Sequence, residues 1–279
     1  MECRARSGII LSSLWLFDGR VQVILEVPGK SGERWLKAEL HAHCSLDPHD
    51  YRMCAHSPEE LIREAASRGY EVLAITCHNL DVWSRELSEY AESLGITLIP
   101  GMEVLAEERF HTLVYNFRTS WENLSTFGKI RARRGPDTLV VAPHPYYPAW
   151  TSLGHQVEKN IDLFDAIEFS GFFTRLVDFN RHAVQTGLKH GKPLIGNSDA
   201  HLLWQLGRTF TWILAEPEVR SVIGAIKRGK VRIESNALSF REAASWWATA
   251  LWRCFSPVHS RPTGAGVRPY AAESPGIFR

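Results

Sequence analysis

Apolar and polar positions alternate in two distinct ways along this chain from Trp35 onward. Short runs rich in Val, Ile and Leu are typical of buried strands, whereas apolar residues spaced three or four apart are typical of helices with one buried face. The runs predict strands over Leu36–His43, Glu71–Thr76, Ile96–Ile99, Met102–Leu105, His111–Phe117, Thr138–Ala142, Asp165–Phe169, Pro193–Gly196, Phe210–Leu214 and Val231–Glu234. The spaced patterns predict helices from Ser57 to Gly69 and over Trp83–Leu94, Trp121–Arg133, Leu176–His190 and Val219–Lys227.

These strands and helices follow one another in turn, which favours a parallel sheet with helices packed outside it. The first helix shows the local signals well, with Ser57 as N-cap, Pro58 in the first turn and Gly69 at the end. The pattern is compatible with a barrel or with an open, doubly wound sheet. We therefore expect an α/β fold.

The N-terminal segment differs from this regular part. Arg4 and Arg6 precede an apolar stretch, Ile9–Phe17, that resembles a signal peptide, but no small-residue cleavage site follows. Asp18-Gly19-Arg20 is instead typical of a turn into a second strand, Val21–Val27. We therefore predict that residues 1–34 form an N-terminal strand extension.

The C-terminal segment, residues 241–279, differs again. Ala243–Phe255 is rich in Trp and is predicted to pack on the domain, with contact to a protein partner as the alternative and an interfacial membrane anchor less favoured. Ser256–Arg279 is rich in Pro, Gly, Arg and Ser and has no periodicity, so disorder is expected there.

Composition and charge narrow the function only slightly. The net charge of +1 gives no general preference for nucleic acid or for an acidic membrane, so any preference for anionic substrates must arise at one site. The five cysteines are scattered and include no C-x-x-C pair, which argues against a disulfide framework and a thiolate zinc site. A reducing, cytoplasmic environment is expected. No apolar run approaches the roughly 20 residues that span a bilayer.

Histidine and carboxylate side chains gather at the predicted ends of several strands. His41 and His43 close the first strand, and alternate residues of a strand point to the same face, so both imidazoles can face one ion. Active sites of β/α folds form where the carboxyl ends of the strands meet. A single histidine is usually structural, but this recurrence predicts a metal cluster made of His41, His43, His78, Glu103, His111, His144, Asp199 and His201.

The donor atoms indicate which ions would bind. Imidazole and carboxylate without thiolate suit Zn, Mn or Fe better than Mg or Ca, which prefer oxygen. These side chains exceed the needs of one ion, so two or three divalent ions bridged by a carboxylate are expected.

Several ordered motifs resemble those of the PHP (polymerase and histidinol phosphatase) family, and the likeness runs from about Trp35 to Ser235. They are Glu39-Leu40-His41-Ala42-His43, Ile75-Thr76-Cys77-His78-Asn79, Gly101-Met102-Glu103, Ala142-Pro143-His144-Pro145 and Asn197-Ser198-Asp199-Ala200-His201. The resemblance implies a distorted (β/α)7 barrel over residues 35–240, with its metal site at the C-terminal edge of the strands.

The same resemblance implies how the ligands divide among the ions. One ion would be held by His41, His43, Glu103 and Asp199. A second would be held by Glu103, His111 and His144, with Glu103 bridging. A third would be held by His78, His201 and a residue of the loop after His43.

Two departures from the family pattern affect the third ion. The loop after His43 often ends in Ser-Asp-Gly in the family, but here Asp47 is the first choice as ligand, with His49 and Asp50 as alternatives. Cys77 stands where the family usually has Asp before its histidine. Loss of an orienting carboxylate there could weaken the third ion by something like tenfold. Cys77 is expected to be a buried inert thiol rather than a soft extra ligand.

The resemblance implies metal-dependent hydrolysis of a phosphate ester, on a small phosphorylated metabolite or a nucleotide. A water activated by the ions would attack phosphorus, Asp199 would help to orient it, and His201 or His78 would protonate the leaving oxygen. Arg175 follows a predicted strand and could bind a second phosphate. The alternatives are a nuclease that trims oligonucleotides from the 5' end with the same metals, and a catalytically degenerate interaction module.

Overall fold

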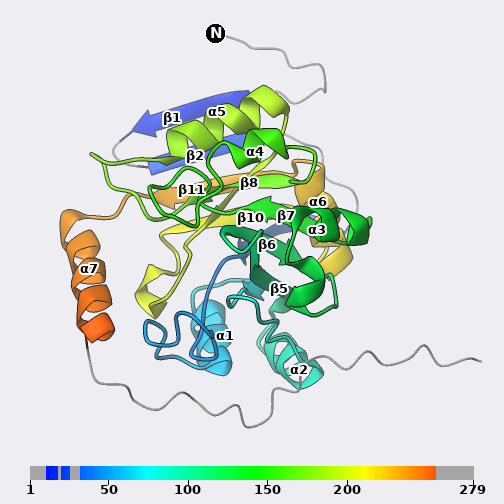
Figure 1. Ribbon diagram of the computed structural model, residues 1–279, viewed down its shortest axis with the longest axis horizontal. Helices are drawn as coiled ribbons and strands as arrows, with labels where there is room; N and C mark the ends of the chain where they lie inside the picture. Colours follow the sequence, from blue (N-terminus) through cyan, green and yellow to red (C-terminus); the bar gives the residue numbers. More distant parts are fainter. Residues whose placement is uncertain (1–10, 18–19, 26–31, 256–279) are drawn as a thin grey trace, which may run out of the picture.

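The structure of the protein is a computed structural model, which describes residues 11–17, 20–25 and 32–255 (Figure 1). Its strands are β1 (Leu11–Phe17), β2 (Arg20–Leu25), β3 (Arg34–Glu39), β4 (Val72–Ile75), β5 (Thr97–Ala106), β6 (Phe110–Tyr115), β7 (Leu139–Ala142), β8 (Ala166–Ser170), β9 (Leu194–Asn197), β10 (Thr209–Ala215) and β11 (Val231–Asn236). Its α-helices are α1 (Pro58–Ser67), α2 (Arg85–Ser93), α3 (Phe127–Arg133), α4 (Gln156–Lys159), α5 (Asn180–His190), α6 (Val219–Lys227) and α7 (Phe240–Phe255). Ser256–Arg279, where we expected disorder, lies outside the described residues.

The strands form one sheet in the order β1-β2-β11-β10-β3-β4-β5-β6-β7-β8-β9. Neighbours pair in parallel from β3 to β5 and from β7 to β9. The expectation of a parallel sheet is wrong at β6 and at β10 with β11, which pair antiparallel with their neighbours. β6 follows β5 through a tight turn, so no helix separates the two strands and they form a hairpin.

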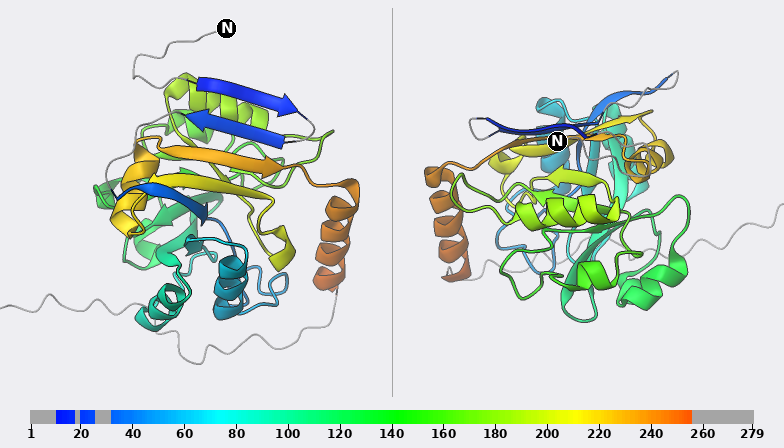
Figure 2. Two further views of the ribbon diagram at one scale, coloured as in Figure 1. Left: turned by 180° about the vertical axis from the view of Figure 1, so that it is seen from behind. Right: turned by 90° about the horizontal axis from the view of Figure 1, so that it is seen from above.

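The sheet curves into a nearly closed barrel with helices outside it, as the two views in Figure 2 show, which confirms the predicted α/β fold and distorted barrel. The last strand, β9, comes close to β10 and β11. The Gly196 N–H donates to Thr211 Oγ1, and the Thr211 hydroxyl donates to the Gly196 carbonyl, both at 2.8 Å. A Cβ atom at Gly196 would lie 2.6 Å from Ile233 Cγ2, so only glycine permits this approach.

The barrel interior is packed with apolar side chains. One buried cluster joins side chains of β3 to β11, among them Leu36, Val72 and Ile195, with Val222 and Ile226 of α6. Because Ala215 at the end of β10 pairs with Arg34 at the start of β3, α6 covers the end of the barrel where the parallel strands begin. The opposite end is left for polar chemistry.

Three predicted boundaries were wrong. Pro100 and Gly101 do not interrupt β5, which runs through both predicted strands as one element because it changes partner from β4 to β6 along its length. The segment predicted as one helix over Trp121–Arg133 is a 3-10 turn, Trp121–Leu124, followed by α3. Helix α5 begins at Asn180, so residues 171–179 form a loop rather than a helical turn.

The terminal elements pack against the barrel. β1 and β2 form a hairpin whose second strand pairs with β11. Helix α7 packs through Trp246 on Phe172 of the 171–179 loop, with ring centroids 4.7 Å apart, which confirms that the Trp-rich segment contacts the domain. Among the described residues, none of the helices has the length and apolar character needed to cross a bilayer.

Candidate metal centre

The structure brings the predicted metal-binding side chains together at the carboxyl ends of the parallel strands. His41 and His43 follow β3, His78 follows β4, His144 follows β7, and Asp199 and His201 follow β9. Glu103 and His111 lie on adjacent strands of the β5–β6 hairpin, where Glu103 pairs with Leu113 and His111 pairs with Leu105. Short bridges continue the pairing beyond the strands, between Ala42 and Ala200 and between His78 and Glu103, and these bridges fix the backbone of the site.

Two carboxylates face the first two imidazoles. Nε2 of His41 lies 3.3 Å from Glu103 Oε2 and 3.3 Å from Asp199 Oδ1. Nε2 of His43 lies 3.5 Å and 3.2 Å from the same two atoms. Four ligands at about 2.0–2.1 Å from a tetrahedral ion are roughly 3.3 Å apart. The four imidazole–carboxylate distances match this separation, and the donor atoms of His41, His43 and Asp199 are close enough to share one ion.

The second oxygen of Glu103 faces a different pair of imidazoles. Oε1 lies 2.8 Å from His111 Nδ1 and 3.3 Å from His144 Nε2. Nε2 of His78 lies 3.1 Å from Oε2, and His78, Glu103 and His111 can share an ion. Glu103 thus stands between two groups of donor atoms, as a bridging carboxylate does.

Several of these atoms are buried and, although they face one another closely, form no hydrogen bond of suitable geometry among the described residues. They are His43 Nε2, Glu103 Oε1, His111 Nδ1 and Asp199 Oδ1. A buried polar atom without a partner costs about 1–3 kcal/mol. Such atoms converging on one point are what a site for a cation requires, so the residues present fit divalent metal ions.

Carboxylates also contact the Nδ1 atoms of three imidazoles, on the side of the ring away from Nε2. His41 Nδ1 lies 2.9 Å from Glu168 Oε1, and His43 Nδ1 lies 2.8 Å from Asp47 Oδ2. Nδ1 of His78 lies 3.0 Å from the same Asp47 oxygen. A carboxylate at Nδ1 fixes the ring orientation and leaves Nε2 free for a metal.

Glu168 was missed by the sequence analysis. It is fully buried in β8, and its Oε2 also accepts the His144 backbone N–H at 2.6 Å. It can share an ion with His41 and His144 as well. The available signal was an acidic residue inside an otherwise apolar strand.

The loop after His43 places its three candidate ligands differently. Asp50 Oδ2 lies 3.0 Å from His201 Nε2 and 3.6 Å from His78 Nδ1. Asp47 accepts the backbone N–H groups of His49 and Asp50 at 2.8 Å in addition to its contacts with imidazoles. The exposed His49 ring stacks on His78 with centroids 5.1 Å apart. His43, Asp47, Asp50 and His78 are close enough to share an ion.

The protonation of the site follows from these contacts. Burial would raise the pKa of Glu103, but the charges of His111, His41 and His78 outweigh it and hold that pKa well below its usual range. Burial would lower the pKa of His201, but the hydrogen bond to Asp50 and the charge of Asp199 raise it to about 9. Imidazole neighbours likewise outweigh burial and hold the pKa values of Asp199, Asp47 and Asp50 below their usual range, so these carboxylates are available to bind cations.

Three residues of the site have left-handed backbone conformations that usually favour glycine. The φ angles are 53° at Asn79, 26° at His144 and 49° at Asp199. Asn79 directly follows the bridge residue His78, and His144 and Asp199 lie two residues after the ends of β7 and β9, where the chain turns out of the sheet. These turns direct the side chains of His144 and Asp199 into the site.

The cysteine in place of the family's usual aspartate faces another thiol. Cys77 Sγ lies 3.4 Å from Cys44 Sγ, and both residues are fully buried. Burial and the hydrogen bond with Cys44 raise the pKa of the Cys77 thiol well above its usual range. Neither thiol belongs to a metal-capable group in the described part of the chain, in keeping with an inert structural role.

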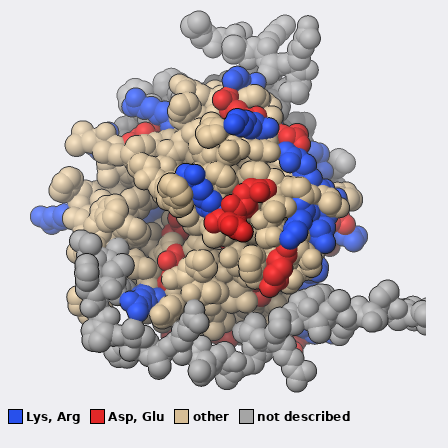
Figure 3. Space-filling view, viewed as in Figure 1, with Lys and Arg blue, Asp and Glu red and all other residues tan. Residues whose placement is uncertain are grey.

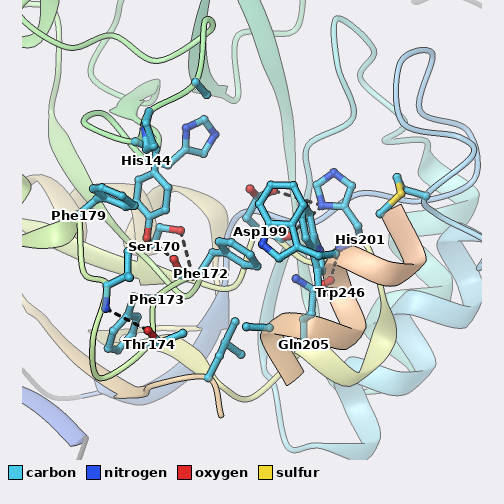
Figure 4. A pocket seen from close by; sticks show the side chains of 18 of the residues that line it. His144, Ser170, Phe172, Phe173, Thr174, Phe179, Asp199, His201, Gln205 and Trp246 are labelled. Carbon is cyan, nitrogen blue, oxygen red and sulfur yellow. Dashed lines mark hydrogen bonds and ion pairs between the residues drawn. The ribbon is translucent and has the colours of Figure 1, made fainter. Parts of the chain in front are cut away.

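A cavity of about 720 Å³ opens next to these side chains. His78, Glu103, His111, His144, Asp199 and His201 all line it, together with Asp50. Arg175, the predicted phosphate-binding residue, is exposed in the 171–179 loop and is not among the residues that line the cavity. Figure 4 shows the part of the cavity in which His144, Asp199 and His201 lie.

Comparison with known proteins agrees with this arrangement. The PHP domain profile matches residues 39–196, and a PHP-associated profile matches residues 178–231. An uncharacterized protein of Methanocaldococcus jannaschii is 27% identical over 149 residues, which cover 50% of this chain and 84% of that protein.

Two solved structures share the fold. A two-domain protein of Bacteroides vulgatus that contains a predicted PHP-like metal-dependent phosphoesterase superposes with a TM-score of 0.57 at 20% identity, covering 80% of this chain and 72% of that one. PsfC from Pseudomonas syringae superposes with a TM-score of 0.50 at 18% identity, covering 79% of this chain and 98% of that one. Because the PHP profile matches more than half of the sequence, and its motifs meet at one edge of the barrel, the chain belongs to the PHP domain family.

Proposed function

We propose that this protein is a metal-dependent phosphoesterase that hydrolyses a small phosphate ester. The position of Glu103 carries the proposal, because its two carboxylate oxygens face separate imidazole groups at distances of 2.8–3.5 Å. The Bacteroides protein with the same fold is described as containing a predicted phosphoesterase of this kind, which supports the same reaction class. Zn, Mn or Fe suits the imidazole and carboxylate donors.

The inner ions would be held by the residues around Glu103. His41, His43, Glu103 and Asp199 would hold one ion, and Glu103, His111 and His144 would hold the other. Bound divalent ions supply a water of lowered pKa and neutralise the charge of the phosphoryl group. Asp199 orients the attacking water, and it lines the cavity together with His201 and His78. Whichever of His201 and His78 is not bound to a metal ion donates a proton to the leaving oxygen.

An outer ion would be held by Asp50, His201 and His78. We assign Asp50 rather than Asp47 as its loop ligand, because Asp50 faces His201 Nε2 directly. Asp47 acts as a positioning residue, since it contacts Nδ1 of both His43 and His78 and also the backbone of its own loop. The sequence favoured Asp47 as this ligand. The metal content of Asp47→Asn and Asp50→Asn variants distinguishes the two assignments.

The nuclease alternative has less support from the charges around the site. Among the described residues that line the cavity, none is Lys or Arg, whereas an oligonucleotide path requires positive charge along the backbone. The basic end of α3 is already engaged, with Arg131 paired to Asp162 and Arg134 to Asp165. A degenerate interaction module is disfavoured because the metal-binding side chains are all in place.

Hydrolysis of 4-nitrophenyl phosphate by the purified protein with added Mn, Zn or Fe tests the proposal. Metal-dependent release of 4-nitrophenol is expected, together with loss of activity after chelation and recovery when metal returns. Shortening of a labelled oligonucleotide without phosphate release from small esters would favour the nuclease. Absence of bound metal and of any hydrolysis would favour the interaction module.

A further inference from the structure

The cavity beside the candidate metal centre has two unlike halves. At one end lie the imidazoles and carboxylates of the site, including Glu103, Asp199 and His201. The opposite wall comes from the 171–179 loop and from α7, and apart from Thr174 its side chains are aromatic or aliphatic. A phosphate ester also has two unlike parts, an anionic phosphate and an organic group. The second wall therefore faces the organic part of any ester whose phosphate lies at the metals.

Aromatic rings form most of this wall. Phe172 lies 4.7 Å from Trp246 between centroids, and Trp246 lies 5.1 Å from Trp247 with the two rings nearly perpendicular, at 89°. Tyr147 packs against Phe179 at 5.2 Å, and its hydroxyl donates to the Phe172 carbonyl at 2.6 Å. In Figure 4, Phe172 lies between Phe179 and Ser170 on one side and Trp246 on the other.

Polar side chains in this wall and beside it already form hydrogen bonds with the backbone. Thr174 Oγ1 accepts the backbone N–H groups of Leu176 and Val177, and Gln205 Oε1 accepts those of His201 and Leu202. The cavity lining contains no Lys or Arg within the described ranges. The wall therefore has little with which to recognise sugar hydroxyls or a second phosphate, both of which need directed polar partners.

Large apolar side chains also stand open to solvent at the cavity. Leu176 is 90% exposed, Phe240 82% and Trp247 56%. Exposed apolar groups that are contiguous with a cavity are typical of a binding site for an apolar ligand. On the face shown in Figure 3, fewer charged groups are visible on the side that carries α7 than on the opposite side, where acidic and basic groups gather.

Helix α7 is fixed where it meets the loop. Leu238 N–H donates to the Phe173 carbonyl at 2.8 Å, and Leu238 pairs with Thr174 as in a parallel strand. Arg208 forms an ion pair with Glu242 in the first turn of the helix. The aromatic wall is thus tied to the barrel and can select among ligands.

We propose that this cavity selects phosphate monoesters whose alcohol part is an apolar, preferably aromatic, group. The proposal rests on the phosphoesterase function above and names its substrate class. Water adds to phosphorus, the bond between phosphorus and the alcohol oxygen breaks, and that oxygen takes a proton, which yields inorganic phosphate and the apolar alcohol. The organic group lies among Phe172, Trp247 and Phe179.

Two substrates with comparable leaving groups provide the test, benzyl phosphate and 2-hydroxyethyl phosphate. Both release a primary alcohol, so their difference reports on the cavity wall rather than on leaving-group chemistry. We expect kcat/KM for benzyl phosphate to be at least about tenfold higher. Equal values, or a preference for 2-hydroxyethyl phosphate or adenosine monophosphate, would overturn the proposal.

Substitution of the wall sharpens this test. Trp247→Ala should lower the ratio of the two kcat/KM values about tenfold, and Phe172→Ala should act in the same direction. Trp252→Ala is the matched control, because Trp252 lies on the same helix, is 67% exposed and does not line the cavity. An unchanged ratio in both wall variants, each with an unaltered melting temperature, would contradict the assignment of the wall.

The two proposals fail in different ways. If neither 4-nitrophenyl phosphate nor either alkyl ester is hydrolysed with any of the metals, both the phosphoesterase function and the substrate class are wrong. If all are hydrolysed but the polar ester is preferred, the function stands and only the substrate class is wrong.

Discussion

The inner and outer parts of the candidate metal centre are built differently. The ligands of the inner part lie on strands or just beyond their ends. The side chains of His41, His43 and Glu103 are at most 1% exposed, and Asp199 is the most exposed inner ligand, at 23%. The outer part depends on Asp50, which lies in the loop after β3 and whose side chain is 34% exposed. Strand ends fix donor atoms through the sheet, whereas a loop fixes them only through its own turns. We therefore expect the inner ions to bind tightly and the outer ion to exchange readily.

The substitution Glu103→Gln tests the inner part most directly and should have the largest effect. Glutamine has nearly the same shape but lacks the charge that bridges the two inner groups, so both inner ions should be lost. Activity toward 4-nitrophenyl phosphate should fall on the order of a thousandfold. Metal content by mass spectrometry and the initial rate measure the two effects together. Full activity with bound metal would refute the inner assignment.

Asp50→Asn should separate the two parts. It removes the anionic partner of His201 while leaving the contacts of Glu103 in place, so the outer ion alone should be lost. Activity should fall about 10- to 100-fold. Asp137→Asn is a suitable control, because Asp137 is similarly exposed and pairs with Arg220. Loss of every ion from Asp50→Asn would show that the two parts are not independent.

Glu168→Gln should lower the metal affinity of the inner part, because Glu168 orients the ligand His41 through its Nδ1 atom. His41 Nδ1 would keep a neutral acceptor but lose the carboxylate charge, and the His144 N–H would lose its carboxylate acceptor. Metal affinity should fall roughly tenfold with the ligands intact. Competition with a chelator of known affinity measures this change. An affinity equal to that of the unchanged protein would mean that Glu168 has no orienting role.

Cys77→Ala should have the smallest effect on chemistry. Because Cys77 packs on Cys44 rather than on the metal-binding atoms, kcat/KM should stay within about twofold, while a small cavity lowers the free energy of unfolding by about 1 kcal/mol. Urea denaturation and steady-state kinetics check the two expectations. A large loss of bound metal would instead assign a ligand role to the thiol.

Most of the inner part could be predicted from the sequence, because strand periodicity places His41 and His43 on one face and parallel strands end at one edge. Glu168 could not be predicted in this way. A single acidic residue in an apolar strand gives no periodic signal, and only the packing of β8 beside β7 and β9 brings it to His41.

The positions of the outer part and of α7 could not be predicted from the sequence, because they depend on interactions that leave no periodic pattern. Asp47 accepts two backbone N–H groups of its own loop, which turns Asp50 toward His201, and such a turn has no repeat to detect. The Trp-rich composition of α7 was visible in the sequence, but its place over the cavity depends on contacts with Phe172 and Phe173, which lie in a loop distant in the sequence.

The left-handed backbone at Asn79, His144 and Asp199 lowers the stability of the folded protein. Such conformations cost about 1–2 kcal/mol for residues other than glycine, so the barrel must provide that stability before any ion binds. Activity and thermal tolerance therefore compete at these positions. Glu108 in the β5–β6 turn has φ of 57° without a place in the site, so replacing it with glycine should relieve strain at no catalytic cost. A more heat-tolerant enzyme is best sought in that turn.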